Sequence, residues 1–317
     1  MDQGKHTDNV WAVLPVVFRM LTGKSCILPA LIYFITLTSF AQDLTIRKIV
    51  AAARDHQPVK FASVAIRNSN HGTYTNLSGE FSITCRSSDS LAISAVGYKK
   101  VIYSCRSLPD TILLNEEALQ LPEVVVSATK HKQHPISLGL YNKKCSGAYT
   151  GANAAALYIA NAGHLDLHIT KVLFLLSKLT WIYNKKPEFY KLLVRLKLYK
   201  RNAFYSGPGE AILPQDITEE VSEKQTSIVF NIDSLNITFP ADGIFVAIEF
   251  PGYYSDGHFT PFNSNDQNKY IQYNAAFTNQ SDTPASWIRL DYENDWRPLK
   301  TGDTVYNFNF GIEVTER

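Results

Sequence analysis

The sequence predicts an all-β protein in which two β-sandwich domains follow a signal peptide. Three observations support this fold class. Apolar side chains recur at every second residue in many short segments, Gly, Asn and Ser turns separate these segments, and aromatic residues, mostly Tyr and Phe, make up 12% of the chain. Alternation buries one face of a strand, and aromatic side chains favour strands. The 317 residues suffice for two domains, and a hydrophobic content of 45% supports packed cores.

The N-terminus has the pattern of an export signal. An apolar run follows Lys24, and small residues stand three and one positions before Gln42. The stretch 26–41 has 16 residues. That is fewer than the about 20 residues that span a membrane. We therefore expect residues 1–41 to be an upstream extension plus a signal peptide, with Met20 as an alternative true start. An uncleaved membrane anchor is the other interpretation.

The first predicted domain comprises residues 42–128. Its turn at 77–80 contains Gly79, which can adopt the positive φ that a tight turn requires. A polar segment, 115–120, is expected to form a turn or a short helix, and a polar linker, 129–135, follows the domain. The predicted strands alternate in hydrophobicity and are bounded by turn residues; they are 61–66, 81–84, 91–96 and 111–114.

Pieces of this domain match the carboxypeptidase regulatory-like domain in order and spacing. They are Phe61-Ala62-Ser63-Val64, Thr75-Asn76-x-x-Gly79-Glu80-Phe81 and Ser94-x-x-Gly97-Tyr98. The following Leu-Pro-Glu-Val-Val-Val at 121–126 resembles the segment that joins this module to the plug of TonB-dependent outer-membrane receptors. The resemblance implies a non-catalytic, prealbumin-like sandwich of an exported protein. It leaves the start of the first strand open, because Val50-Ala51-Ala52-Ala53 replaces the usual Gly-x-Val.

The chain has four cysteines, and removal of residues 1–41 would leave three, which allow one disulfide. Cys85 follows the predicted strand 81–84 and could pair with Cys105 in an oxidising compartment. Cys145 would then remain as a single thiol. Three small buried thiols are the alternative interpretation.

The second predicted domain comprises residues 136–317 and is expected to be a jelly-roll-like sandwich. An Ala- and Gly-rich stretch, 147–162, is expected to form a short helix or an irregular arm. The domain also resembles the one that accompanies the regulatory-like module in short secreted proteins, at 194–199, 207–208, 229–233 and 240–249. Its predicted strands are 165–176, 192–199, 227–232, 243–250, 271–278, 287–292 and 305–314.

A receptor barrel is not expected in this sequence. About 180 residues follow the linker, which is too few for a plug and a large transmembrane barrel. Lipid-facing alternation with aromatic girdles is also not evident. We therefore expect the regulatory-like module without plug or barrel, and no transmembrane domain after signal cleavage.

Motifs of catalysis or metal binding are missing from the sequence. His164 and His168 are four residues apart, but the Glu that follows the first His of a helical zinc motif is absent. The sequence has no Gly-x-Ser-x-Gly elbow and no phosphate-binding Gly-x-x-x-x-Gly-Lys loop. We therefore expect no catalytic residue, no cofactor and no metal site.

Aromatic residues mark a candidate ligand surface. The stretch 251–270 is expected to be a long loop in which aromatic and amide or carboxylate side chains alternate, and loops of this length commonly carry a function. Aromatic rings with flanking polar groups suit sugar rings, although the same rings could seal the end of the sandwich. Asn263 to Asp266 could also supply oxygen ligands for Ca²⁺. The candidate residues are Tyr253, Tyr254, Asp256, Phe259, Trp287 and Trp296.

Charge excludes one class of partner. The net charge is +2, so no strong field attracts nucleic acid. Residues 171–201 hold nine Lys or Arg and one acid, Glu188. This stretch is either a basic face for anionic glycans or lipid headgroups, or the solvated side of two strands. In 194–199, Arg195, Lys197 and Tyr199 lie opposite the apolar face.

The leading functional hypothesis is a non-catalytic, exported envelope protein of a Gram-negative bacterium that acts as an interaction or assembly module. Its expected location is the periplasm, the outer membrane or the cell surface. Its expected partner is an envelope or outer-membrane protein, or a glycan. The alternatives are a glycan-binding accessory protein for polymer uptake and a hydrolase whose site is not visible in the linear sequence.

Overall fold

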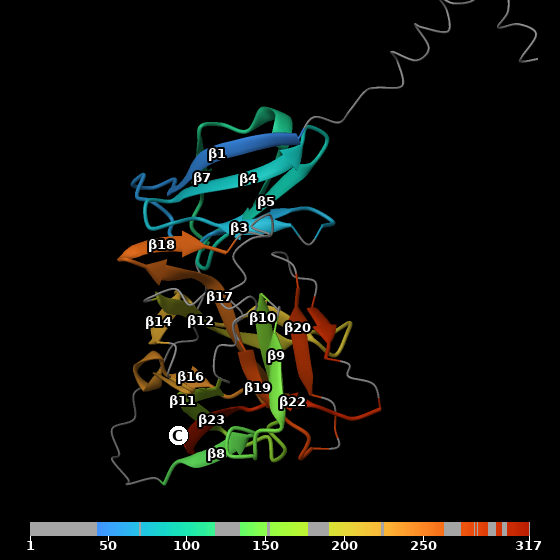
Figure 1. Cartoon of the computed structure of the whole chain (residues 1–317). Helices are drawn as coiled ribbons and strands as arrows, with labels where there is room; N and C mark the ends of the chain where they lie inside the picture. Colours follow the sequence, from blue (N-terminus) through green and yellow to red (C-terminus); the bar gives the residue numbers. More distant parts are fainter. Residues whose placement is uncertain are drawn as a thin grey trace, which may run out of the picture. The chain divides into compact units, whose positions relative to one another are not determined.

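The computed structural model describes residues 43–69, 71–117, 134–150, 153–176, 190–222, 225–262, 274–281, 283, 285–290, 296–299 and 303–316. Residues 44–317 form one compact unit. Within the described ranges the elements are β-strands and two short 3-10 helices (Figure 1). The predicted all-β fold class is confirmed. The described residues contain no helix with the length and hydropathy needed to cross a membrane.

The N-terminal sandwich consists of two small sheets. One has the strand order β4-β1-β7, with β1 and β7 parallel, and the other has the order β3-β2-β5-β6. A core that includes Val50, Val64, Ile83, Ile93 and Ile112 draws side chains from both sheets. The elements are β1 (Asp43–Ala52), β2 (Ser63–Ile66), β3 (Gly72–Tyr74), β4 (Glu80–Arg86), β5 (Ser90–Ser94), β6 (Val101–Ser104), η1 (Cys105–Ser107) and β7 (Thr111–Leu114).

The four predicted strands of this half correspond to β2, β4, β5 and β7. The first strand, whose start the sequence left open, is β1. The strand predicted from residue 61 begins at Ser63, because Phe61 has a φ of 55° and lies in a turn. Residues 118–133 and 1–42 lie outside the described residues, so the signal peptide, most of the linker and the domain boundaries remain predictions.

Gly79 fixes the turn before β4 against β1. Its φ is 73°, and a Cβ at this position would collide with the carbonyl oxygen of Val50. The Val50 N–H donates to the Gly79 carbonyl at 2.8 Å. The Asn76 side chain holds the turn by accepting from the N–H groups of Ser78 and Glu80, both at 2.9 Å. A glycine is therefore required here by conformation and by close approach.

A disulfide joins Cys85 on β4 to Cys105 at the start of η1. The two Cα atoms are 6.8 Å apart, and both residues are buried in the core of the N-terminal sandwich. Because β4 belongs to one sheet and η1 directly follows β6 of the other, the bond connects the two layers. Cys145 is a free, exposed cysteine.

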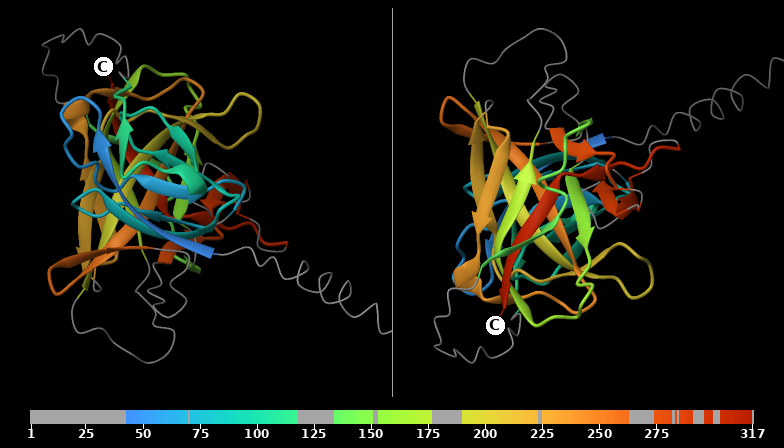
Figure 2. Two further views of the ribbon diagram at one scale, coloured as in Figure 1. Left: turned by 90° about the horizontal axis from the view of Figure 1, so that it is seen from above. Right: turned by 90° about the horizontal axis from the view of Figure 1, so that it is seen from below.

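The C-terminal sandwich contains larger sheets, seen from two further directions in Figure 2. Its elements are β8 (Ile136–Gly139), β9 (Gly147–Thr150), β10 (Ala154–Ile159), β11 (Leu167–Leu175), β12 (Tyr190–Arg201), β13 (Pro208–Ala211), β14 (Ile217–Ser222), β15 (Ser227–Asn231), η2 (Asp233–Leu235), β16 (Ile237–Thr238), β17 (Ile244–Ser255), β18 (His258–Pro261), β19 (Asn274–Thr278), β20 (Ser286–Arg289), β21 (Trp296–Pro298), β22 (Asn307–Phe308) and β23 (Phe310–Glu316).

An eight-stranded sheet has the order β13-β12-β17-β10-β20-β21, with β14 beside β12 and β18 beside β17. A five-stranded sheet has the order β15-β11-β23-β8 with β16 beside β11, and a three-stranded sheet has the order β22-β19-β9. The main core lies between the inner faces of these sheets and includes Leu157, Phe174, Leu196, Val246 and Phe310.

The opposite face of the eight-stranded sheet is also covered. Tyr199, Phe245, Ala247 and Trp296 form a second buried cluster there. Strands β10, β12 and β17 are therefore buried on both sides, and β17 has a continuous run of buried residues from Ile244 to Tyr253. Arg195, Lys197 and Tyr199 are buried, contrary to the expectation that this side of the strand is solvated.

Two element predictions for this half are wrong. Residues 147–162 contain the strands β9 and β10, and the alanines at 154–156 point alternately into two buried clusters. The loop predicted from residue 251 is a hairpin of β17 and β18. Its turn is Asp256-Gly257, and both residues have positive φ, as a two-residue hairpin turn requires. Residues 263–270, with the suggested Ca²⁺ ligands, lie outside the described residues.

Candidate functional site: a buried charge cluster

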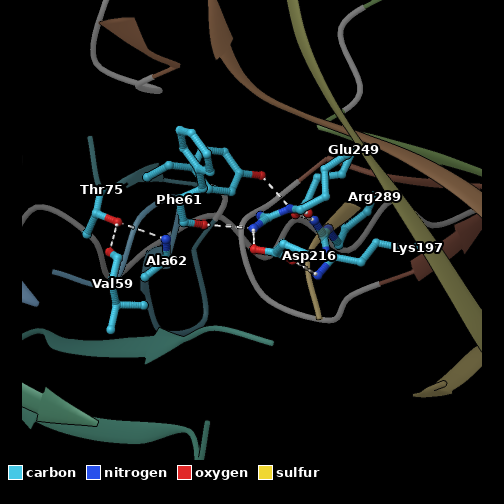
Figure 3. Close-up of polar contacts among 10 residues, drawn as sticks. Val59, Phe61, Ala62, Thr75, Lys197, Asp216, Glu249 and Arg289 are labelled. Carbon is cyan, nitrogen blue, oxygen red and sulfur yellow. Dashed lines mark hydrogen bonds and ion pairs between the residues drawn. The ribbon is translucent and has the colours of Figure 1, made fainter. Parts of the chain in front are cut away.

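Ionisable side chains meet where the N-terminal and C-terminal sandwiches contact each other (Figure 3). We call this group the charge cluster. Its members are Tyr74 of β3, Arg195 and Lys197 of β12, Asp216, which precedes β14, Glu249 of β17 and Arg289 of β20. Five of the six are buried by residue exposure, and the Asp216 side chain is about one quarter exposed.

Glu249 is the centre of the charge cluster. Arg195 donates from Nε to Glu249 Oε2 at 2.7 Å, and Arg289 donates from Nη2 to Oε1. The hydroxyl of Tyr74 donates to the same Oε1 at 3.0 Å. One carboxylate therefore links two strands of the C-terminal sandwich to a strand of the N-terminal sandwich.

Arg195 carries a second connection between the sandwiches. Its Nη1 donates to Asp216 Oδ2 and to the backbone carbonyl of Phe61, both at 2.9 Å. Its guanidinium also lies over the ring of Tyr74, 5.6 Å from the centroid. Lys197 donates to the other oxygen of Asp216 at 3.3 Å. Hydrogen bonds of this kind to charged groups are the stronger ones in proteins.

The backbone at Phe61, whose carbonyl accepts from Arg195, has an unusual conformation. A φ of 55° is unusual for a bulky residue and is maintained only where its surroundings enforce it. The Phe61 N–H donates to the Thr75 carbonyl at 3.1 Å, and the Ala62 N–H donates to Thr75 Oγ1 at 2.8 Å. Thr75 Oγ1 donates in turn to the Val59 carbonyl at 2.6 Å (Figure 3). The Phe61 ring packs edge-on against Phe259 of β18, with centroids 5.0 Å apart.

The electrostatics follow from burial and pairing. Burial alone would raise the pKa of Glu249. The positive charges of Arg195 and Arg289 lower this pKa by more than burial raises it, so the net pKa lies well below the ordinary 4.5. Burial lowers the pKa of Lys197, and the positive charge of Arg195 lowers it more. Burial raises the pKa of Tyr199, which lies beside the cluster, to about 12. The cluster holds three basic and two acidic side chains, so Lys197 is the cation whose charge is least favoured.

Both acid and alkali are expected to destabilise the protein through these groups. The folded pKa of Glu249 is depressed, so its contribution to stability is present above pH 4.5 and is lost as the pH falls below that value. The folded pKa of Tyr199 is raised from 10.0 to about 12, so its contribution is complete below pH 10 and is lost as the pH rises through 12. Urea-unfolding midpoints across this pH range test both signs. The alkaline decrease should shrink in Tyr199→Phe, and an equal decrease in that variant would contradict the assignment.

Sequence reasoning missed the charge cluster. Arg195 and Lys197 alternate with apolar residues and therefore resemble the solvated side of a strand. The available signal was Glu249, a single acid within the apolar run of β17. A charge in the middle of a buried strand requires an opposite charge nearby.

The predicted ligand surface does not form one exposed aromatic face. Tyr253 and Trp296 are buried, so neither offers an open ring for stacking. The Trp296 ring packs against Tyr199 and lies under the guanidinium of Arg289. Burial on both sides of the eight-stranded sheet is the physical reason for this correction.

The other four predicted surface residues are dispersed among different contacts. Tyr254 and Phe259 are partly exposed and pack on each other with centroids 5.2 Å apart. Asp256 is exposed in the turn of their hairpin. Trp287 is partly exposed and contacts the rings of Phe245 and Tyr205.

His168 takes part in a surface network. Its Nε2 lies 2.6 Å from Asp233 Oδ1, and its Nδ1 lies 3.1 Å from Thr315 Oγ1. An acid, a histidine and a hydroxyl in contact are also the components of a hydrolase triad. His168 and Thr315 are a cross-strand pair of β11 and β23, so the register of the sheet by itself accounts for their contact. His164 instead contacts the Ala241 carbonyl at 2.8 Å. Among the described residues, no three His, Cys, Asp or Glu side chains are grouped as a metal site.

Comparisons with known proteins match parts of the chain. The family model of the CarboxypepD_reg-like domain matches residues 49–126. Over 93 residues the chain is 29% identical to the TonB-dependent receptor SusC of Bacteroides thetaiotaomicron. The matched segment covers 29% of this chain and 9% of that receptor. The chain thus spans less than a tenth of the curated relative it matches. The order β1 to β7, the Gly79 turn and these matches together show that the chain carries a carboxypeptidase regulatory-like domain at residues 49–126.

Proposed function

We propose that this protein is a non-catalytic envelope protein that works as an interaction or assembly module. The observation that carries the proposal is the charge cluster. Glu249 and Arg195 each bond across the contact between the sandwiches, to Tyr74 and to the Phe61 carbonyl. Tyr74, Arg195 and Glu249 are thereby engaged in holding a regulatory-like domain on a second sandwich. A pair of domains joined in this way presents a fixed outer surface to a partner.

The likeness to a segment of a TonB-dependent receptor supports an envelope location. The disulfide between Cys85 and Cys105 agrees with an oxidising compartment outside the cytoplasm. Glycan binding was the other candidate from the sequence, and its aromatic platform loses Tyr253 and Trp296 to burial. An envelope protein is therefore favoured as the partner class over a glycan.

Cell fractionation and cross-linking in the organism that encodes the chain test this proposal. A tagged full-length chain is expected in the envelope fraction, cross-linked in a constant ratio to a specific envelope protein. The cross-link should weaken when Glu249→Ala disturbs the contact between the sandwiches and persist in the exposed control variant Glu220→Ala. Recovery of the chain in the cytosol, or of uncross-linked chain alone in the envelope, would overturn the proposal.

An activity measurement addresses the hydrolase alternative. Peptide and ester substrates are expected to remain intact in the presence of the purified chain. Turnover that disappears in both His168→Ala and Thr315→Ala would show that their network is catalytic and that the protein is an enzyme.

A further inference from the structure

The hairpin between β12 and β13 presents an unusually exposed aromatic residue. Phe204 is 99% exposed and its neighbour Tyr205 is 42% exposed. From Asn202 to Gly209 this hairpin contains no charged residue. The yellow loop that projects from the sheets in both views of Figure 2 corresponds to it. A large apolar side chain that the backbone holds in full contact with water indicates an interaction site.

The hairpin is held in place by its own hydrogen bonds. Asn202 Oδ1 accepts from the N–H groups of Phe204 and Tyr205, at 2.8 and 3.2 Å. The Asn202 N–H donates to the Gly207 carbonyl at 2.9 Å, and the Tyr205 hydroxyl donates to the Pro208 carbonyl at 2.8 Å. Phe204 therefore projects from an ordered turn.

Polarity changes in layers from the tip of the hairpin toward the sheet. Ala203 and Phe204 form the apolar tip. Behind them the rings of Tyr205 and Trp287 lie 6.0 Å apart, on either side of Gly207, where a Cβ would collide with both rings. The next layer is charged: Arg201 is exposed and lies over the Tyr158 ring, and Lys200 forms an exposed ion pair with Glu210.

We propose that this hairpin docks on a lipid bilayer, with Phe204 in the boundary between headgroups and acyl chains. Amphipathic rings prefer the level of the headgroups, which fits Tyr205 and Trp287. A cation in the next layer toward the sheet is placed to meet lipid phosphates, which fits Arg201. A convex tip without charge cannot enclose a ligand, but it can insert into a bilayer surface. The proposal goes beyond the assembly function, because it assigns a lipid contact and requires no partner protein.

Vesicle binding tests the lipid contact. Residues 42–317 contain every described strand and both cores, and they omit the apolar stretch 26–41, which would itself enter lipid. This form is expected to co-sediment with vesicles of phosphatidylethanolamine and phosphatidylglycerol. Phe204→Ser should weaken the binding by roughly tenfold or more, because a buried Phe side chain is worth at least that factor. Ile102→Ser is the matched control: Ile102 is 50% exposed on β6, and its loss should leave binding unchanged.

A tryptophan at the tip provides a direct readout of insertion. Phe204→Trp is expected to show fluorescence that shifts to shorter wavelength with vesicles and is quenched by lipids brominated in their acyl chains, beyond the change in the parent protein. Thermal unfolding should be the same for the parent and both Phe204 variants, since the side chain has no packing to lose. Equal vesicle binding by Phe204→Ser, no binding by the parent, or no extra quenching would overturn the proposal. Loss of a cross-linked envelope protein in Phe204→Ser, without vesicle binding by the parent, would assign the tip to a protein partner instead.

Discussion

Replacing Glu249 with alanine is expected to lower the free energy of unfolding by about 3–5 kcal/mol, the usual cost of removing one partner of a buried ion pair. The substitution leaves the guanidinium groups of Arg195 and Arg289 buried without their shared carboxylate. It also removes the acceptor of the Tyr74 hydroxyl. Urea unfolding followed by circular dichroism measures the change, with the midpoint compared at a constant slope.

An exposed ion pair provides the matched control for this variant. Glu220 accepts from Lys191 at 2.8 Å, and both side chains are about half exposed. Glu220→Ala should therefore cost less than about 1 kcal/mol. Similar losses in Glu249→Ala and Glu220→Ala would show that the charge cluster is solvated.

A milder variant separates the contact between the sandwiches from the interior of the C-terminal sandwich. Tyr74→Phe deletes only the hydroxyl that bonds Glu249 from the N-terminal sandwich. Because this bond is made to a charged group, we expect a loss of about 1.5–3 kcal/mol. Tyr103→Phe, at a partly exposed position of β6, is the control and should have little effect.

Much of the N-terminal sandwich could be predicted from the sequence because its information is local, although β6 was not among the predicted strands and the start of β1 was left open. Alternation predicted β2, β4, β5 and β7, and the Gly79 turn is specified by one residue that must adopt positive φ. Alternation was less informative where strands are buried on both faces. In β10 and β17 every position from Ala154 to Leu157 and from Ile244 to Tyr253 is buried, so the period of two that marks a half-buried strand is lost.

The charge cluster could not be predicted from linear spacing. Its residues come from β3, β12, β17, β20 and the segment before β14, and only the tertiary fold brings them together. Arg195 is 134 residues from Phe61, and Glu249 is 175 residues from Tyr74. The residues next to them in the sequence do not indicate either contact. The prediction of one exposed aromatic face was wrong for the same reason, because residue type alone does not reveal which layer of the fold covers a ring.

Removing the disulfide is expected to cost the N-terminal sandwich about 3 kcal/mol. Cys85 and Cys105 are 20 residues apart in sequence, and closing a loop of that length restricts the unfolded chain by about this free energy. The double variant Cys85→Ala and Cys105→Ala keeps the site apolar, which suits two residues that are buried in the core. The exposed Cys145 is the control, and Cys145→Ala should change the stability by less than about 0.5 kcal/mol.

Reductant distinguishes the cross-link from simple core packing. The urea midpoint of the parent protein should fall when a strong reductant is added, whereas the midpoint of the double alanine variant should not move. Mass spectrometry of an unreduced digest should also recover the peptides of Cys85 and Cys105 as one species. If the parent midpoint were insensitive to reductant, the two thiols would be acting only as small buried side chains. Because the bond joins the two layers of the regulatory-like domain, a sensitive midpoint would also tie the stability of this domain to an oxidising compartment.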